Sequence, residues 1–182
     1  MFRRFCLAMF PLLALLSGSV SHPAPPGFRT LEIGDAAPDF ELPGVDDRSH
    51  RLADFAESPV LMVIFTCNHC PTAQAYEQRI MQMHADFKDR GVALVAISPN
   101  DPLAVRLDEV VYTDLSDSLL EMKFRAKQRG FLFPYLYDCE KQEVSAAYGV
   151  LATPHVFIFD QNRKLRYQGR IDDSEVKTVR SH

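Results

Sequence analysis

Three short segments of the chain are apolar at almost every position. They are Val60–Phe65, Val92–Ile97 and His155–Phe159. Strands that are buried on both faces have this pattern, whereas strands with one solvent-exposed face alternate apolar and polar residues. We therefore expect these segments to form the middle of a β-sheet that is covered on both sides.

A helical pattern separates the first two of these strands. It follows the strand through the segment Thr66–Pro71, continues to Arg90 and is closed by Gly91. Its apolar residues recur three or four positions apart, at Tyr76, Ile80, Met83 and Phe87. A strand, a helix and a second strand in this order predict a parallel pair of strands joined by a right-handed crossover.

Weaker patterns complete the predicted α/β architecture, and residues 99–114 read as a surface loop. Turn residues between short alternating runs predict a hairpin near the N-terminus, and glycines mark two helix ends. The expected strands are Asp39–Leu42, Arg48–Leu52, Pro134–Tyr137 and Lys164–Gly169, and the expected helices run from Ser116 or Asp117 to Arg129 and from Glu140 to Tyr148.

The N-terminal segment differs from the rest of the chain. Arg3 and Arg4 precede the apolar run Phe5–Leu16, and small residues follow, with Ser19 and Ser21 in the positions expected before a cleavage site. A membrane-spanning helix needs ~20 residues, and this run is much shorter. We predict a signal peptide over 1–21, with an uncleaved anchor as the alternative, then a Pro-rich linker over 22–33 and one folded domain over 34–182.

The composition and charge limit the expected binding partners, and the predicted signal peptide indicates the cellular compartment. Of the 182 residues, 47% are hydrophobic and 24% are charged, which is typical of a globular domain. The net charge is −4 and the basic residues are scattered, so nucleic acid is not an expected partner. Export and signal cleavage would leave the protein periplasmic or extracellular, without stable membrane insertion.

The chemistry of the chain is concentrated at Cys67 and Cys70. A zinc site normally needs four ligands, and the sequence has no second CxxC. A CxxC between a strand and a helix is instead typical of a redox dithiol. We expect Cys67 to lie in the first turn of the helix, where the helix dipole lowers a thiol pKa, and Cys70 to close a disulfide with it.

Three neighbouring features leave alternatives open. His69 can stabilise a thiolate when protonated, or it can point to solvent. Cys139 reads as an ordinary thiol in a turn, or as a resolving or intermolecular partner. The bond between Thr153 and Pro154 lies before an apolar strand, and local evidence favours the trans form.

Several motifs together resemble the AhpC/TSA-type redoxins, and most closely the thioredoxin-family proteins with a CNHCP motif. The matching segments are Gly34–Leu42, Leu52–Phe55, Cys67–Pro71, Tyr148–Pro154 and Gly169–Asp173. The resemblance covers about residues 34–174. It implies a thioredoxin fold with a central mixed sheet, an N-terminal hairpin extension and a cis Pro154 facing the dithiol. It also implies that Cys67 attacks, that Cys70 resolves, and that Asn68, His69 and Thr153 shape the site.

The chain departs from the pattern of such families at several positions. Leu61 stands where thioredoxins often carry a buried acid, and Ala73 stands where some redoxins carry a Glu. Peroxiredoxins carry a Thr three residues before the peroxidatic Cys. The residue at that distance is Ile64 when counted from Cys67, and it is Cys67 when counted from Cys70. The resemblance also implies a last helix after Asp173, for which the chain leaves little length.

Three functions follow as hypotheses. The first is an exported thiol–disulfide oxidoreductase that needs no cofactor, acts on protein thiols and disulfides, and is recycled by an unknown reducing partner. The second is a thiol peroxidase with antioxidant activity, against which the missing Thr argues. The third is a Cu(I)-binding or zinc-binding module with Cys67, Cys70, His69 and His155 as candidate ligands, since thiolates and imidazoles suit these metals. The alternative for His155 is a strand residue that lies beside the active site without binding a metal.

Overall fold

The computed structural model describes residues 29–103 and 115–173. The predicted signal peptide, most of the linker, most of the 99–114 loop and any helix after Asp173 lie outside these ranges. Within them, no helix is long and apolar enough to cross a membrane.

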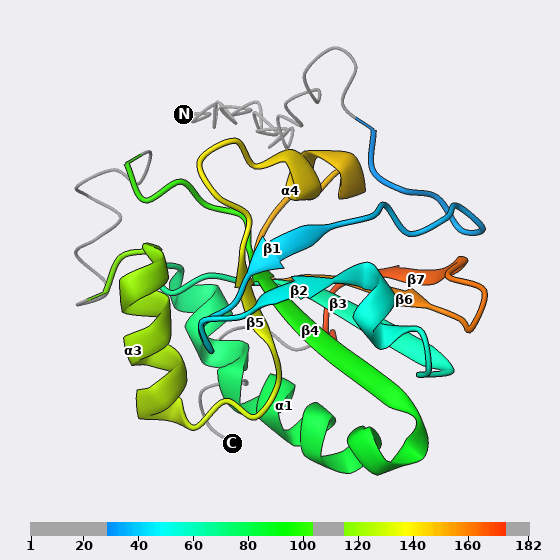
Figure 1. Cartoon of the computed structure of the whole chain (residues 1–182), viewed down its shortest axis with the longest axis horizontal. Coiled ribbons are helices and arrows are strands. Elements are labelled where there is room, and N and C mark those ends of the chain that lie inside the picture. Colours follow the sequence, from blue (N-terminus) through cyan, green and yellow to red (C-terminus); the bar gives the residue numbers. More distant parts are fainter. Residues whose placement is uncertain (1–28, 104–114, 174–182) are drawn as a thin grey trace, which may run out of the picture.

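A mixed five-stranded sheet forms the centre of the molecule (Figure 1). The strand order is β5-β4-β3-β6-β7, where β3, β4 and β5 run parallel and β6 and β7 run antiparallel to their neighbours. The strands are β3 (Val60–Phe65), β4 (Val92–Ser98), β5 (Tyr135–Tyr137), β6 (His155–Phe159) and β7 (Leu165–Gly169). The three segments predicted to be buried strands are therefore the three middle strands of the sheet.

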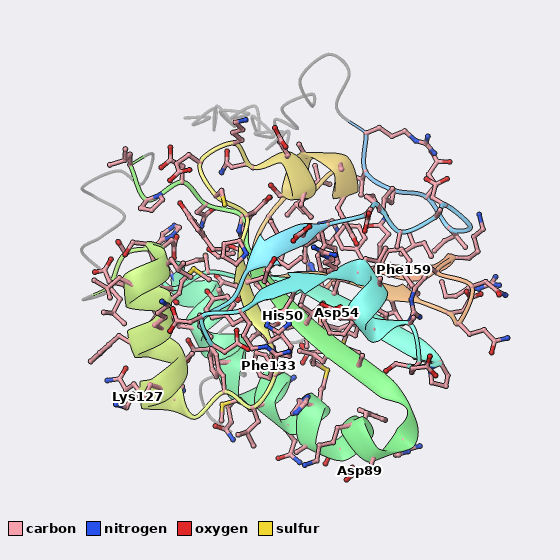
Figure 2. The ribbon with its side chains drawn as sticks, viewed as in Figure 1. His50, Asp54, Asp89, Lys127, Phe133 and Phe159 are labelled. Carbon is pink, nitrogen blue, oxygen red and sulfur yellow. The ribbon has the colours of Figure 1, made fainter. Side chains whose placement is uncertain are left out.

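Helices α1 (Pro71–Phe87) and α3 (Leu119–Arg129) cover one face of this sheet. Their apolar side chains, such as Ile80 and Met122, pack on Met62 and Ile64 of β3. Figure 2 shows Phe133 within this part of the molecule, while Lys127 and Asp89 extend outward. Lys127 belongs to α3, whereas Asp89 lies in the short turn just after α1. The outward charge of Lys127 agrees with the amphipathic sequence of α3.

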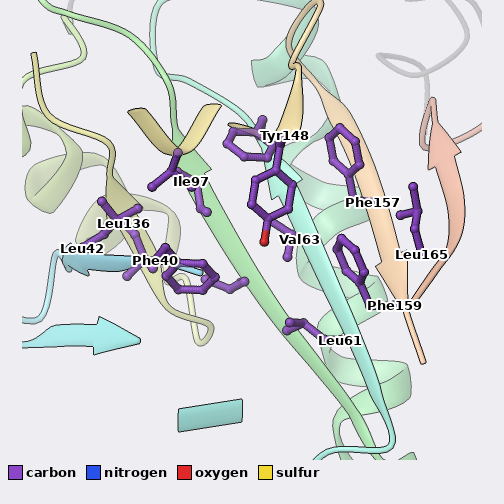
Figure 3. Close-up of a cluster of buried hydrophobic side chains, with 13 residues drawn as sticks. Phe40, Leu42, Leu61, Val63, Ile97, Leu136, Tyr148, Phe157, Phe159 and Leu165 are labelled. Atoms are coloured by element: carbon purple, nitrogen blue, oxygen red, sulfur yellow. The ribbon is translucent and has the colours of Figure 1, made fainter. Parts of the chain in front are cut away.

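The opposite face is covered by α4 (Glu143–Tyr148) and by the predicted N-terminal hairpin, β1 (Glu41–Pro43) and β2 (Ser49–Arg51). Alternate residues of β3 point to this side, which is why the strand is apolar throughout. Figure 3 shows the resulting cluster, in which the ring of Tyr148 meets those of Phe157 and Phe159 edge to face. Short 3-10 turns at Leu52–Phe55 and Lys88–Arg90 complete the described elements.

Three helix starts differ from the sequence predictions, and the first is that of α4, which begins at Glu143 where Glu140 was expected. Helix α1 begins at Pro71 with Cys70 as its N-cap, so Cys67 lies before the helix and not in its first turn. Proline is favoured at the first helical position because it has no N–H to leave unpaired there. Helix α3 is capped by Ser118, whose hydroxyl accepts the Glu121 N–H, and neither Ser116 nor Asp117 is the cap.

Candidate active site

The CxxC loop lies at the carboxyl end of β3, where the chain passes into α1. Cys67 and Cys70 are both free thiols, as is Cys139 in the turn after β5. Thr66 continues the ladder beyond β3, since its N–H donates to the Ile97 carbonyl at 2.9 Å. This central strand holds the start of the loop against the sheet core.

The Thr153–Pro154 bond is cis and faces the dithiol, as the resemblance implied and the local expectation did not. The Thr153 hydroxyl lies 3.2 Å from Cys67 Sγ, and Cys70 Sγ donates to the Thr153 carbonyl at 3.8 Å. The segment before β6 therefore contacts both sulfur atoms, although it lies more than 80 residues away in sequence.

Asn68 is an anchor of the loop and is only 1% exposed. Its side-chain N–H donates to the Ser116 carbonyl at 2.8 Å, and its side-chain oxygen accepts the Tyr135 hydroxyl at 3.3 Å. Gln74 donates to its backbone carbonyl at 2.7 Å. These contacts hold the dipeptide between the cysteines in one conformation.

Asp117 is a residue of the candidate site that the sequence prediction did not include. Its side chain is fully buried. One carboxylate oxygen accepts the backbone N–H groups of Asn68 (2.6 Å) and His69 (3.3 Å), and the other accepts His69 Nδ1–H and the Asn100 amide (2.8 Å). His69 therefore does not simply point to solvent, because its ring is bound to a buried carboxylate.

One pattern in the sequence indicates that Asp117 is not the helix cap and is available for another role. Ser118 and Glu121 have the spacing of a capping box, S-x-x-E, which places the helix cap at Ser118. Asp117 was thus not needed as a cap. A buried acid at the site was not expected because Leu61 and Ala73 occupy the positions considered, and both are buried apolar residues in the structure.

The two cysteines have different electrostatic surroundings. Hydrogen bonding from the Cys67 thiol, with the N–H groups of Ala73 and Thr72, lowers the pKa of Cys70 to about 5 against the opposing effect of burial. The same thiol–thiolate contact, burial and the nearby Asp117 raise the pKa of Cys67. A thiolate is therefore favoured at Cys70 and disfavoured at Cys67.

A pocket of about 390 Å³ opens beside the dithiol. Cys70 and His69 form one wall, and the segment Val150–Thr153 forms another, together with residues of α4. Leu151 is two-thirds exposed at this edge. The pocket combines an apolar rim with a reactive sulfur, which suits a polypeptide or another large thiol compound.

His155 does not join this site. Its Nε2–H donates to the Gln168 side chain at 3.0 Å, and its Nδ1 accepts the Leu151 N–H at 3.4 Å. Burial lowers its pKa, so the neutral ring fits these two roles. The structure therefore does not bring His155 to the other predicted ligands, Cys67 and Cys70, because one ring nitrogen binds Gln168 on β7 and the other binds Leu151 in the segment before β6.

In the described part of the chain, the potential metal ligands that converge are Cys67, His69 and Asp117, whose donor atoms lie within 4.8 Å of one another. The Asp117 oxygens already accept four hydrogen bonds, two of them from the backbone. A metal would have to displace these donors. The arrangement fits a carboxylate that orients an imidazole and a loop better than it fits a preformed metal site.

Comparison with known proteins places this geometry in a family. The chain is similar to the curated thiol-disulfide oxidoreductase ResA of Geobacillus thermodenitrificans, at 25% identity over 85% of this chain and 81% of the relative. It is also similar to a solved structure of an uncharacterized conserved protein from Geobacillus kaustophilus, at 37% identity, with a TM-score of 0.71 over 79% of this chain and 71% of the other.

A solved structure of lower sequence identity supports the assignment of the fold. The thioredoxin domain of a thiol-disulfide oxidoreductase from Bacteroides vulgatus superimposes with a TM-score of 0.61, at 18% identity, over 84% of this chain and 98% of that domain. The predicted thioredoxin fold is thereby confirmed. The AhpC/TSA family model matches residues 33–168, which confirms the resemblance, and the chain belongs to the AhpC/TSA family.

Proposed function

We propose that this protein is a thiol–disulfide oxidoreductase that cycles Cys67 and Cys70 between a dithiol and a disulfide. The observation that carries the proposal is the arrangement of the two sulfur atoms near the start of α1. Both contact Thr153, and Cys70 also lines the neighbouring pocket. The name of the ResA relative supports the same chemistry. The reaction needs no cofactor, because the two thiols supply both electrons.

The expected substrates are thiols and disulfides of other proteins. The pocket has an exposed apolar residue, Leu151, at its edge, and Ala152 and Thr153 line it beside Cys70, an arrangement suited to contact with a polypeptide. A separate reducing or oxidising partner would return the dithiol to its starting state.

Dithiol exchange tests the proposed function directly. Purified protein, with Cys139→Ser as a background substitution, should reduce insulin disulfides in the presence of dithiothreitol. Mass mapping should find a Cys67–Cys70 disulfide in the oxidised protein. Replacing either cysteine by serine should abolish turnover, and full activity of Cys67→Ser or Cys70→Ser would refute the proposal.

Peroxidase activity is the second candidate, and membership of the AhpC/TSA family supports it. Cys70 at the helix start has a lowered pKa, as a peroxidatic thiolate requires. Ile64 and Cys67 stand where a peroxidatic Thr is expected, and neither offers a hydroxyl. Stopped-flow oxidation by hydrogen peroxide separates the two functions, since a rate close to that of a free thiol would exclude the peroxidase.

Export is part of the proposal because residues 1–21 have the pattern of a signal peptide. The expected mature chain begins at His22 and resides in the periplasm or outside the cell. Expression of the full chain, followed by cell fractionation and N-terminal sequencing, tests this. An intact N-terminus in the membrane fraction would instead indicate the uncleaved anchor.

A further inference from the structure

Cys67 and Cys70 differ in their access to solvent. Cys67 is 3% exposed, whereas Cys70 is only half-buried. Cys70 also lines the pocket beside the site, and among the described residues Cys67 is not part of that lining. A substrate sulfur that enters from the pocket would therefore meet Cys70 first.

The helix start stabilises negative charge at Cys70. Cys70 is the N-cap of α1, and its carbonyl accepts the Gln74 N–H at 3.0 Å. The N–H groups of Thr72 and Ala73 interact with its sulfur. Unpaired N–H groups and the helix dipole favour a thiolate at this position. Cys67, three residues earlier, lies outside the helix.

The surroundings of Cys67 oppose a negative charge. The contact with Cys70, burial and the Asp117 carboxylate raise the pKa of the Cys67 thiol. Asp117 is buried and accepts four hydrogen bonds. Its carboxylate lies within 4.8 Å of the Cys67 sulfur. Two like charges this close in a buried site repel strongly, so the Cys67 sulfur retains its proton.

Other groups face Cys67 from the neighbouring elements. The Tyr135 phenol of β5 is neutral, since burial raises its pKa. Among residues 29–103 and 115–173, the groups that face Cys67 are Cys70, the His69 ring, the Asp117 carboxylate, the Thr153 hydroxyl and the Tyr135 phenol. His69 is tied to Asp117 through Nδ1, so its ring and the carboxylate act on the dithiol as one hydrogen-bonded unit.

We propose that Asp117 is a positioning residue that assigns the attacking role to Cys70 and the resolving role to Cys67, the reverse of the order implied by the resemblance. This inference rests on the proposed function. Asp117 acts by binding the Asn68–His69 backbone, which holds the loop, and by keeping the buried Cys67 thiol protonated until it resolves the mixed disulfide.

The exchange is balanced in two steps. The Cys70 thiolate attacks a substrate disulfide, a disulfide forms between Cys70 and the substrate, and the other substrate sulfur leaves as a thiolate. The Cys67 thiol then loses its proton and attacks Cys70 Sγ. The Cys67–Cys70 disulfide forms, the second substrate sulfur leaves, and one substrate sulfur takes up the proton. Two protein thiols are oxidised and one substrate disulfide is reduced.

Single-cysteine variants decide which sulfur attacks. Reduced Cys67→Ser and Cys70→Ser proteins, both carrying Cys139→Ser, are mixed with oxidised glutathione, and the mixed disulfide is followed by mass spectrometry. Serine at 67 can still donate a hydrogen bond to Cys70. We expect Cys67→Ser to form its mixed disulfide about tenfold faster or more, which corresponds to about one unit of thiol pKa or greater. Equal rates, or a faster reaction of Cys70→Ser, would overturn the assignment.

Limited alkylation tests the same assignment of the attacking cysteine without changing either cysteine of the pair. Reduced protein carrying only Cys139→Ser is treated briefly with iodoacetamide at neutral pH, and the modified site is mapped. The first label should be on Cys70. A first label on Cys67 would overturn the assignment.

The role of Asp117 is tested with Asp117→Asn in the Cys70→Ser protein. Removing the carboxylate charge should move the pH profile of Cys67 alkylation to lower pH and raise its rate at neutral pH by about tenfold. Asp138→Asn is the matched control, because Asp138 is also a buried acid but binds the backbone of Val144 and Ser145. An unchanged pH profile, or the same change in the control, would refute this role.

If Asp117→Asn does not fold, the titration of Cys67 in the Cys70→Ser protein still tests the inference. Its thiol should ionise above the ordinary pKa, and ionisation below that value would contradict the role of Asp117. A different outcome would refute the proposed function, namely that protein with both cysteines forms no Cys67–Cys70 disulfide during exchange. Protein that cycles but forms its mixed disulfide on Cys67 would leave the proposed function intact and remove only this inference.

Discussion

His69 and Asp117 are joined by a hydrogen bond from the His69 Nδ1–H to a buried carboxylate oxygen, although they are 48 residues apart in sequence. The other carboxylate oxygen accepts the backbone N–H groups of Asn68 and His69. One side chain therefore sets the conformation of the loop between the cysteines and the orientation of its imidazole. The tautomer with Nδ1–H leaves Nε2 as the nitrogen that gains or loses a proton.

The first prediction concerns the redox potential. Replacing His69 with Asn removes an imidazole that, when protonated, stabilises the neighbouring thiolate and hence the reduced form. The reduction potential of the Cys67–Cys70 pair should fall by about 30 mV, which corresponds to about 1.4 kcal/mol for two electrons. Equilibration with glutathione or dithiothreitol buffers measures this value.

His84→Asn is the control for that experiment. His84 lies in the last turn of α1, and its ring meets Phe133 edge to face. The potential should not change in this variant. A rise in potential on replacing His69, or an equal shift in both variants, would contradict the prediction.

The second prediction concerns pH. The pKa of Cys70 falls from 9.0 to about 5 in the folded reduced protein. Because the folded pKa is the lower one, this ionisation stabilises the reduced fold fully above the ordinary pKa, and the stabilisation is lost as the pH falls toward about 5. Thiolate absorbance of Cys67→Ser should therefore persist at neutral pH and disappear near pH 5. A midpoint near 9 would refute the lowered pKa.

The third prediction concerns the anchor Asn68. Changing it to Ala leaves the Ser116 carbonyl without its amide donor and the Tyr135 hydroxyl without its acceptor in a buried site. The free energy of unfolding should decrease by about 1–3 kcal/mol, as measured by urea denaturation of the reduced protein. Asn162→Ala in the exposed β6–β7 turn is the control and should stay within about 0.5 kcal/mol of the parent.

The fourth prediction concerns the contact between α1 and α3. Glu77 is 5% exposed and pairs with Arg125 at 2.7 Å and Arg129 at 2.8 Å. Glu77→Ala leaves the largely buried Arg125 without its carboxylate, so stability should fall by about 3 kcal/mol. Lys141→Ala, which removes an exposed pair with Glu143, should cost less than about 1 kcal/mol. Similar decreases in the free energy of unfolding of the two variants would contradict the prediction that losing a buried ion pair destabilises the protein more than losing an exposed one.

Much of the fold could be predicted from local patterns. Val60–Phe65 and His155–Phe159 match β3 and β6, because a strand buried on both faces must be apolar throughout. The end of α3 was also predicted correctly, since Gly130 adopts the left-handed conformation that closes a helix. The start of α1 was placed too early, because a CxxC alone does not indicate where the helix begins.

The candidate site could be predicted only in part. Cys67, Cys70 and the cis Pro154 were expected from the motif and the resemblance, and the structure brings them together. His155 was expected near the dithiol as a possible ligand, but the side chain turns to Gln168 on the neighbouring strand. A pattern shows which residues share a strand, and it does not show which side-chain atoms find partners across the sheet.

The sequence by itself determined the strand and helix order, the two buried faces of the sheet and the identity of the candidate dithiol. These properties depend on hydrophobic periodicity and on residue types at close spacing, which are local. The tertiary structure alone decided that Asp117 meets His69, that Cys67 is buried and that Cys70 caps the helix and lines the pocket. These depend on contacts between distant segments and on burial, which set the electrostatic difference between two otherwise identical thiols.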